Sequence, residues 1–331
     1  MTAAPLVGII ANPASGKDIR RLIALGSSID NNEKINIVRR MLAGLDALGV
    51  AAVAYMPDTY GIVQRAAAAM TLRLDVSPLP MACIGVPGDS EEAARRLADM
   101  DAAVILTLGG DGTNRVVARG CGATPLVAVS TGTNNVFPRL VEGTLAGLAA
   151  AAVAIGAAPE ATIRRQPCLA IAIDGERRDL ALIDAVTTRQ GWIGARAVWR
   201  PDDIREVVLS RVPSAAIGLA SLGAVLLPEA RGGDTGAYIV VDQIAPHRVL
   251  APLAPGVLSE IGIASARTLA PGDEVILRPG PCTIALDGER EIELLDDRAA
   301  ATVTLVPDGP RLVDIDAAVN AAAAAGVFRV A

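Results

Sequence analysis

Two short polar turns, each placed directly after an apolar run, constrain the fold of this chain more than any other feature. The first run, residues 104–108, is rich in β-branched side chains like a buried parallel strand, and the turn Gly-Gly-Asp-Gly-Thr at 109–113 follows it without a spacer. A similar run at 125–129 leads into Ser-Thr-Gly-Thr-Asn-Asn at 130–135, and a short helix is predicted between them at 114–119. Because the carboxyl ends of parallel strands meet at one sheet edge, where α/β proteins bind ligands, we expect both turns at one site.

The residues of these two turns indicate phosphate binding. Glycine allows φ > 0 and lets backbone N–H groups approach a ligand, and polar side chains add further donors. The residues expected to contact phosphate are Gly109, Gly110, Gly112, Thr113, Thr131, Gly132, Thr133, Asn134 and Asn135. Asp111 is different, because its carboxylate would repel a phosphate. We interpret it as the catalytic residue, either a base that accepts a hydroxyl proton or a ligand for Mg²⁺, although Asp before Gly is also common in ordinary turns.

The first half of the chain alternates apolar strands with helical periodicity. This pattern predicts an α/β domain with a parallel sheet over residues 1–158. Strands are expected at 6–11, 50–56, 81–86, 104–108 and 125–129, and helices at 30–48, 60–70, 89–100 and 142–156. Two uncharged stretches, 143–159 and 212–228, are shorter than the ~20 residues of a membrane span and are predicted to be buried helices.

Short strands separated by Pro and Gly dominate the second half of the chain. They predict a mainly β domain, built as a sandwich, over residues 159–300. Its strands are expected at 168–173, 179–188, 238–244, 256–263, 274–277, 283–286 and 291–295. The last segment, 301–331, should form a strand at 301–306 and a helix at 316–325.

Composition narrows the class of protein. Aromatic residues make up 2% of the 331 residues and the net charge is −6 without a basic block, so nucleic acid is not an expected partner. Four widely spaced cysteines and one histidine argue against a zinc site and favour a reducing compartment. Since no basic segment of the signal-peptide kind precedes the first strand, we expect a cytoplasmic protein without a membrane span, and we expect it to form a homo-oligomer.

The Gly-Gly-Asp-Gly-Thr turn, followed one strand later by a second glycine turn, resembles the superfamily shared by NAD kinases and the diacylglycerol and sphingosine lipid kinases. The second turn is more similar to the Gly-Thr-Gly-Asn turn of the lipid kinases. Nearly the whole chain resembles the NAD-kinase-like proteins encoded with bacterial acetoin-catabolism genes. The resemblance implies ATP as phosphate donor, Mg²⁺ as cofactor and small-molecule nucleotides as partners, and it implies that the C-terminal segment returns to the first domain.

A third turn, Asn-Pro-Ala-Ser-Gly-Lys at 12–17, follows the first predicted strand. It lacks the spacing of a Walker A loop, which requires GxxxxGK[ST]. It resembles the turn that opens lipid kinases and lies beside their nucleotide, which adds Asn12, Ser15 and Gly16 to the expected nucleotide-binding residues. Taken alone, an Asn-Pro turn that caps a helix explains the same residues equally well.

Segments of the second domain bear on the phosphate acceptor. Residues 181–186 are similar to a segment of NAD kinases in which an Asn and an acidic residue hold the adenosine, so the resemblance makes Asp184 an acceptor-binding residue. Ile183 replaces the Asn, and residues 213–226 lack the hydroxyl cluster that NAD kinases carry there. Asp287, in an Asp-Gly-Glu turn, is by resemblance a candidate metal ligand, whereas Asp-Gly is also the favoured pair of a plain hairpin.

Three hypotheses of function follow. The first is an ATP-dependent kinase that phosphorylates a hydroxyl of NAD or a related nucleotide. The second is a kinase for a lipid or a small alcohol, which the turns at 12–17, 132–135 and 287–289 favour. The third is a nucleotide-binding regulator without catalytic activity, linked to acetoin catabolism. The lost Asn at position 183 and the lost hydroxyl cluster predict, in each case, a poor NAD kinase.

Overall fold

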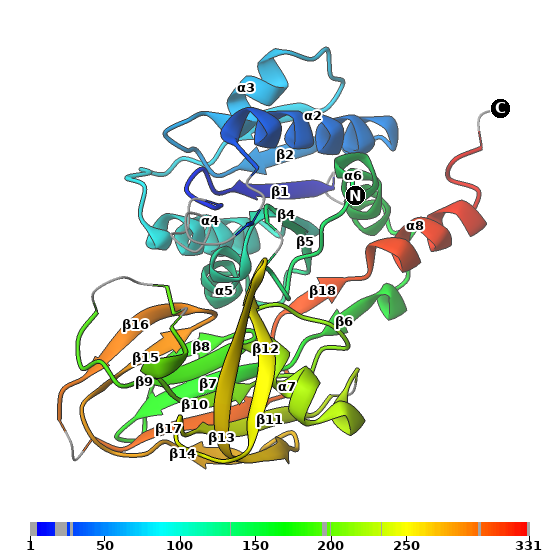
Figure 1. The fold of residues 1–331 in the computed structure, drawn as a ribbon. Coiled ribbons are helices and arrows are strands. Elements are labelled where there is room, and N and C mark those ends of the chain that lie inside the picture. Colours follow the sequence, from blue (N-terminus) through cyan, green and yellow to red (C-terminus); the bar gives the residue numbers. More distant parts are fainter. Residues whose placement is uncertain are drawn as a thin grey trace.

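The computed structural model describes residues 5–16, 25–26, 29–132, 134–193, 197–198, 200–232, 234–296 and 299–329. The chain forms two domains (Figure 1). The first, drawn from blue to dark green, is an α/β structure, and the second, drawn from light green to orange, consists mostly of strands. The predicted fold class is confirmed, because the sheet of the first domain is mostly parallel and those of the second are antiparallel.

A seven-stranded sheet forms the centre of the first domain. Its order is β3-β2-β1-β4-β5-β18-β6, and every neighbouring pair is parallel except β18 and β6. The strands are β1 (Leu6–Ala11), β2 (Ala52–Tyr55), β3 (Asp75–Pro78), β4 (Val104–Gly109), β5 (Leu126–Ser130), β6 (Ile163–Arg165) and β18 (Arg311–Val313). The central strands β4 and β5 are buried along their whole length, which explains their continuous apolar runs.

Helices cover both faces of this sheet. One face is covered by α2 (Asn31–Ala47), α3 (Ile62–Ala68), α6 (Gly143–Ala154) and α8 (Ile315–Ala324), and the other by α4 (Pro87–Asp99) and α5 (Asp111–Gly120). The Ala- and Gly-rich helix α6 packs closely on α2, since a Cβ atom on Gly147 would lie only 2.3 Å from the Met41 carbonyl oxygen. The helix predicted in the uncharged stretch at 143–159 is therefore present and buried.

The prediction of a strand at 81–86 is wrong. This segment is a loop, and the strand of this region is β3. The N–H groups of Ile84, Gly85 and Val86 donate to Oδ2 of Asp89, in the first turn of α4, at 2.7 to 3.1 Å. Backbone donors that a carboxylate occupies cannot also form the ladder of a sheet.

Two antiparallel sheets pack face to face in the second domain, as predicted for a sandwich. Their orders are β12-β13-β11-β10-β9-β15-β16 and β14-β17-β7-β8. The strands are β7 (Cys168–Ile173), β8 (Glu176–Ala181), β9 (Asp184–Thr188), β10 (Ile204–Leu209), β11 (Gly236–Val241), β12 (Arg248–Ala254), β13 (Val257–Leu269), β14 (Glu274–Ile276), β15 (Cys282–Leu286), β16 (Glu289–Leu294) and β17 (Ala301–Val306). Leu169 and Val303 from one sheet meet Val208 and Ile284 from the other in a shared apolar core.

Several details of the second domain differ from expectation. The single strand predicted at 179–188 is two strands, β8 and β9, which belong to different sheets. Strands β10 and β12 were not predicted, and β13 extends to Leu269 instead of 263. Only part of the stretch 212–228 is helical, namely α7 (Ala220–Leu226). Short 3₁₀ helices occupy Glu160–Thr162, Pro201–Asp203 and Pro228–Ala230.

The C-terminal segment is shared between the domains. β17 pairs with β7 in the second domain, whereas β18 pairs with β5 and β6 in the first sheet, and α8 packs on the first domain beside α6 (Figure 1). The sheets to which these strands belong therefore do not change at the domain boundaries expected at residues 158 and 301. β6 extends the first sheet beyond 158, and the return to the first domain begins only after β17.

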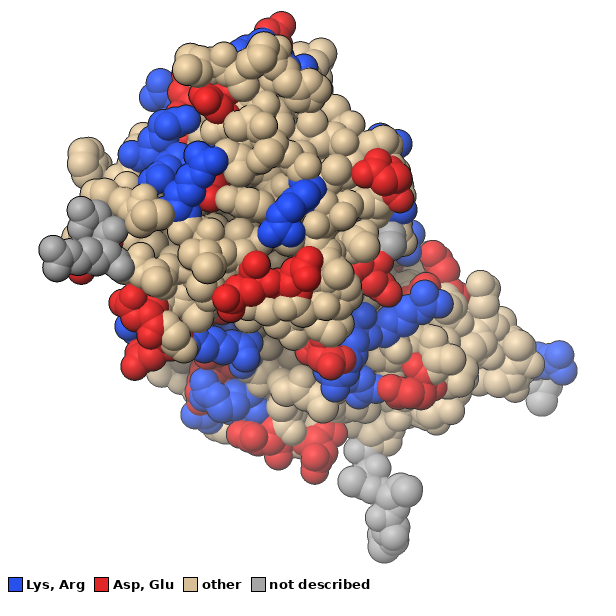
Figure 2. All heavy atoms as spheres, turned by 90° about the horizontal axis from the view of Figure 1, so that it is seen from below, with Lys and Arg blue, Asp and Glu red and all other residues tan. Residues whose placement is uncertain are grey.

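The long hairpin of β12 and β13, drawn in yellow in Figure 1, reaches from the second domain to the first. At its turn the Leu25 N–H donates to the Pro255 carbonyl oxygen at 2.9 Å. Seen from below, in Figure 2, the surface carries acidic and basic side chains interspersed with each other. Among the described residues, every helix is too short or too polar to cross a membrane.

Candidate functional site

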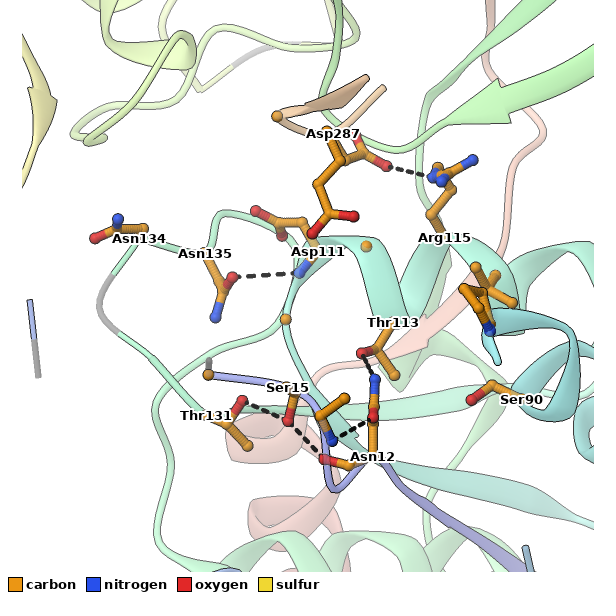
Figure 3. Close-up of a pocket in the computed structure, with 18 of the residues that line it drawn as sticks. Asn12, Ser15, Ser90, Asp111, Thr113, Arg115, Thr131, Asn134, Asn135 and Asp287 are labelled. Atoms are coloured by element: carbon orange, nitrogen blue, oxygen red, sulfur yellow. Dashed lines mark hydrogen bonds and ion pairs between the residues drawn. The ribbon is translucent and has the colours of Figure 1, made fainter. Parts of the chain in front are cut away.

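The three predicted turns surround one cavity of about 600 Å³ between the two domains. Loops at the carboxyl ends of β1, β4 and β5 form its first-domain wall (Figure 3), and the second-domain wall includes the link between β8 and β9 and the turn between β15 and β16. The predicted residues that line it are Asn12, Ser15, Gly16, Gly110, Asp111, Gly112, Thr113, Thr131, Asn134, Asn135, Asp184 and Asp287. Gly109 and Gly132 do not line it, and Thr133 lies outside the described residues.

A fully buried lysine, Lys34 of helix α2, holds the turn that follows β1. Its Nζ donates to the carbonyl oxygens of Ser15 at 2.7 Å, Asn12 at 2.9 Å and Pro13 at 3.3 Å, and to Oδ1 of Asn31 at 3.1 Å. A buried ammonium needs such acceptors, because an unpaired buried charge is very costly. The lysine therefore fixes the direction of the carbonyl groups in this turn.

The direction of these carbonyl groups also determines where the N–H groups point. In a trans peptide the C=O and N–H groups point in opposite directions. The Ser15 carbonyl points at Lys34, so the N–H of the following residue, Gly16, points away from the ammonium. Gly16 lines the cavity and has φ 83°, a left-handed conformation that favours glycine. The N–H groups of Ala14 and Ser15 donate to Asn12 within the turn, so Gly16 is the residue of this turn whose N–H is oriented away from Lys34 as a donor for an anion.

Side-chain hydrogen bonds join the turn after β1 to the other two turns (Figure 3). Asn12 Nδ2 donates to Thr113 Oγ1 at 2.9 Å, and Thr131 Oγ1 donates to Ser15 Oγ at 3.1 Å. The residues that the sequence places on three separate segments therefore form one connected polar surface.

Asp111 is the first residue of helix α5, which begins three residues earlier than predicted. Its carboxylate accepts the N–H of Val136 at 3.0 and 3.1 Å and that of Phe137 at 2.8 Å, while its own N–H donates to Asn135 Oδ1 at 3.2 Å. A carboxylate is also favourable at a helix N-terminus. The position of Asp111 in this glycine turn thus has a structural explanation besides the expected catalytic role, since it fixes the chain after the turn at 130–135.

The glycines of the first domain's central turn act through close packing, which corrects the expectation of φ > 0. Gly109 ends β4, Gly110 has φ −97°, and Gly112 is helical. A Cβ atom on Gly109 would lie 2.5 Å from the Thr113 Cβ, and one on Gly110 would lie 2.8 Å from Asn135 Oδ1. Gly109 therefore leaves room for Thr113 within its own turn, and Gly110 lets this turn approach Asn135 of the turn at 130–135.

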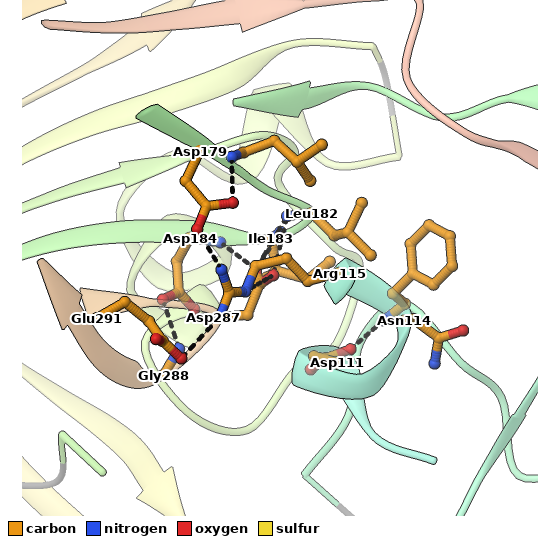
Figure 4. A network of polar contacts seen from close by, with 12 residues as sticks. Asp111, Asn114, Arg115, Asp179, Leu182, Ile183, Asp184, Asp287, Gly288 and Glu291 are labelled. Carbon is orange, nitrogen blue, oxygen red and sulfur yellow. Dashed lines mark hydrogen bonds and ion pairs between the residues drawn. The ribbon is translucent and has the colours of Figure 1, made fainter. Parts of the chain in front are cut away.

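Arg115 of helix α5 reaches the second domain and binds three of its carboxylates (Figure 4). Its distances are 2.7 Å to Glu291 Oε1, 2.8 Å to Asp179 Oδ2 and 3.9 Å to Asp287 Oδ2. The Arg115 side chain is only 4% exposed. Burial alone would lower its pKa, but the carboxylates of Asp287, Asp179 and Glu291 outweigh that effect and raise the pKa. The arginine stays charged and ties the two domains together.

Asp287 lies in the turn between β15 and β16 with φ 51°, and its side chain is completely buried. Its carboxylate accepts the N–H groups of Ile183 at 2.7 Å, Leu182 at 3.0 Å and Asp184 at 3.3 Å. Burial raises the pKa of Asp287 to about 6, although Arg115 and these N–H groups act in the opposite direction. The carboxylate of Asp287, in the hairpin of β15 and β16, therefore holds the link between β8 and β9, although the two segments are more than 100 residues apart in the sequence.

These contacts argue against the expected role of Asp287 as a metal ligand, since its side chain is completely buried and its oxygens already accept three backbone N–H groups. Asp184 is also tied into this turn: its Oδ1 accepts the Gly288 N–H at 3.1 Å. Among the described residues, no group of three or more His, Cys, Asp or Glu side chains is arranged to hold a metal ion. Mg²⁺, however, usually binds one or two carboxylates together with substrate phosphates, and the carboxylates of Asp111 and Glu289 both line the cavity.

Lys34 and Arg115 are the residues that the sequence-based prediction missed. Lys34 could have been found from the sequence, because it lies on the same face of helix α2 as the apolar residues Val38, Met41 and Leu45. A lysine on such a buried face needs buried partners for its charge. Arg115 carried none beyond its place after the Gly-Gly-Asp-Gly-Thr turn, because its partners lie more than 60 residues away in the sequence.

Comparison with known proteins gives two matches to families along the chain. Residues 7–156 match the family described as ATP-NAD kinase N-terminal domain, and residues 167–308 match the one described as acetoin catabolism protein X C-terminal domain. Acetoin catabolism protein X of Cupriavidus necator is 39% identical over 330 residues, which cover 95% of this chain and 91% of that protein.

Two of the similar solved structures come from Bacillus anthracis str. Sterne. One, described as a putative diacylglycerol kinase, has 12% sequence identity and a TM-score of 0.48. The other, described as a diacylglycerol kinase, has 13% identity and a TM-score of 0.44. Each match covers 95% of this chain and 98% of the other chain.

Proposed function

Since the chain belongs to the family of acetoin catabolism protein X, we propose that it is a phosphotransferase that moves the γ-phosphoryl group of ATP to a hydroxyl group of a small molecule. The observation that carries this proposal is the linked set of three turns around one cavity. Asn12, Ser15, Thr113 and Thr131 are joined there by hydrogen bonds, beside the N-terminus of α5. Helix N-termini and turns with exposed N–H groups are the usual binding sites for phosphate.

In the proposed reaction, the oxygen of the acceptor hydroxyl forms a bond to the γ-phosphorus while the bond from that phosphorus to the bridging oxygen breaks. ADP leaves, and the hydroxyl proton passes to the carboxylate of Asp111. Asp111 lies in the cavity beside the phosphate turns, and its contacts to Val136 and Phe137 fix its orientation. Mg²⁺ bound with the nucleotide would neutralise phosphate charge, and Glu289, whose carboxylate also lines the cavity, would hold it together with the phosphates.

NAD is a poor candidate for the acceptor. Ile183 lines the cavity where an NAD kinase would have an amide, and its own N–H is used by Asp287. Ile217, Leu219 and Ala220, from the segment that lacks the hydroxyl cluster, also line it. Polar atoms of NAD that lose a partner would each cost ~1–3 kcal/mol, so two such losses weaken binding by ~10²-fold or more.

The test is a phosphorylation assay with the purified full chain, Mg²⁺ and ATP, in which ADP release is followed with NAD and with a panel of alcohols. ATP binding is measured in parallel by calorimetry. Turnover with an alcohol supports the proposal. ATP binding without turnover on any acceptor would instead favour a nucleotide-binding regulator, and NADP formation with kcat/KM above ~10⁴ M⁻¹s⁻¹ would make the protein an ordinary NAD kinase.

A further inference from the structure

The second-domain wall of the cavity differs in chemistry from the first-domain wall. Ile183, Val198, Leu219 and Leu253 line it, and each is less than a tenth exposed. They come from four separate places: the β8–β9 link, the segment before β10, the start of α7 and strand β12. An apolar surface built from four segments is a preformed wall of the kind that binds the body of a small molecule.

The charged groups on this wall are carboxylates. Asp184, Asp287, Glu289 and Glu291 line the cavity, whereas among the described lining residues Arg115 is the single cation. Arg115 already pairs with Asp179 and Glu291 at 2.8 and 2.7 Å. With four carboxylates and one arginine around it, this wall is negative overall although Arg115 pairs with Glu291, so an anionic acceptor would be repelled, and the described part of the wall offers it no uncommitted arginine or lysine.

The cavity must also hold the donor. Its volume of about 600 Å³ is in the middle of the ~300–1,000 Å³ that a site for one drug-sized ligand occupies. If the triphosphate of ATP binds along the polar turns, the space against the second-domain wall suits a molecule much smaller than a second nucleotide. Size, apolarity and charge therefore select the same kind of acceptor.

We propose that the phosphate acceptor is a small, uncharged alcohol with a mostly apolar body, and that the carboxylates of the second-domain wall exclude anionic alcohols. This inference rests on the proposed phosphotransferase function and specifies its substrate class. The reaction balances as described above: the alcohol oxygen gains the phosphoryl group, ADP leaves, and the hydroxyl proton goes to Asp111. The product is a small phosphate monoester, which the acidic wall repels and so helps to release.

The experiment compares acceptors that differ mainly in charge. Lactamide and lactate have nearly the same shape and the same hydroxyl group, and glycerol and glycerol 3-phosphate share two hydroxyl groups. Acetoin and 2,3-butanediol extend the uncharged set, and dioleoylglycerol in mixed micelles and NAD serve as large acceptors. We expect the best uncharged small alcohol to exceed the best anionic acceptor at least tenfold in kcat/KM. A preference for lactate, glycerol 3-phosphate, NAD or dioleoylglycerol would overturn the inference but leave phosphotransfer itself intact.

A pair of variants tests the role of charge. Glu289→Gln removes a carboxylate at the cavity, and Glu274→Gln makes the same chemical change on exposed strand β14, away from the cavity. We expect the first to narrow the preference for uncharged over anionic acceptors severalfold, and the second to leave it unchanged. An equal response of both variants, or none in either, would show that the wall does not select by charge. Absence of turnover with every acceptor would refute the proposed function instead.

Discussion

The chain contains the same dipeptide, Asp-Gly, on the two opposite walls of its cavity, and the two copies have different structures. Asp111-Gly112 begins a helix in an ordinary right-handed conformation, and Asp111 is partly exposed. Asp287-Gly288 is a hairpin turn in which both residues are left-handed, at φ 51° and 81°, and the Asp287 side chain is completely buried. The flanking elements determine the conformation of each dipeptide. Asp111-Gly112 lies between a strand and a helix, whereas Asp287-Gly288 joins two antiparallel strands.

The two aspartates nevertheless share one physical task. Each carboxylate accepts backbone N–H groups of a segment distant in the sequence: Val136 and Phe137 for Asp111, and the β8–β9 link for Asp287. The difference lies in what surrounds them. Asp111 lies among the three glycine-containing turns that line the cavity, whereas Asp287 faces a buried arginine. An aspartate in a glycine turn can therefore be a structural anchor, a reactive group or both, and only the groups around it distinguish these roles.

The largest expected effect separates the two aspartates by function. Asp111→Asn should reduce phosphoryl transfer by ~10²–10⁴-fold, the usual contribution of a general base, while the circular dichroism spectrum stays unchanged. The nearly isosteric amide cannot accept the proton. Asp287→Asn, the matched change on the opposite wall, should mainly lower stability. If Asp111→Asn keeps more than about a third of the wild-type rate, Asp111 is only an anchor.

Removal of the arginine that faces Asp287 should cause the largest loss of stability. Arg115→Met leaves the carboxylates of Asp179, Asp287 and Glu291 without a counter-charge, and breaking a buried pair typically costs ~3–5 kcal/mol. Urea unfolding measures the change in the free energy of unfolding. Arg119→Met, on the same helix but 37% exposed, is the control and should cost ~1 kcal/mol or less. Similar losses in both variants would contradict a special role for Arg115.

Nucleotide binding at the first-domain wall should depend on Lys34, which holds the turn after β1. Lys34→Met removes the donor that orients the carbonyl groups of Asn12 and Ser15, and each buried acceptor left unpaired costs ~1–3 kcal/mol. We expect ATP affinity, measured by calorimetry, to fall about tenfold or more. Arg39→Met changes an exposed residue of the same helix and should leave the affinity unchanged. Unaltered ATP binding in Lys34→Met would place the turn after β1 outside the nucleotide site.

The smallest expected effect is a dependence of stability on pH. The pKa of Asp287 is raised to about 6 in the folded protein, above the ~3.9 of an unfolded chain. Between these values the folded state binds more protons than the unfolded state, so the free energy of unfolding should increase as the pH falls from about 6 to 4, by ~1–3 kcal/mol. Asp287→Asn should lack this contribution. Urea titrations of both proteins at several pH values measure it, and parallel curves would show that Asp287 titrates normally.

Much of the first domain could be predicted from local sequence. Its apolar strands at 6–11, 104–108 and 125–129, its helices, and the three turns after those strands were placed within a few residues. The reason is that each signal is local: burial on both faces produces a continuous apolar run, and parallel strands bring their carboxyl ends to one edge. Most of the predicted site residues therefore line one cavity. Gly109 and Gly110, however, are required for close packing and not for φ > 0.

Only the tertiary structure decided the rest, because the contacts that decide it join residues far apart in the sequence. Asp287 breaks the run at 179–188 into β8 and β9 from more than 100 residues away, and Arg115 finds its carboxylates on the other domain. β6 and β18 complete the first sheet from either end of the second domain. The sequence determined which groups could bind phosphate; the packing of two domains determined that those groups face an apolar, acidic wall.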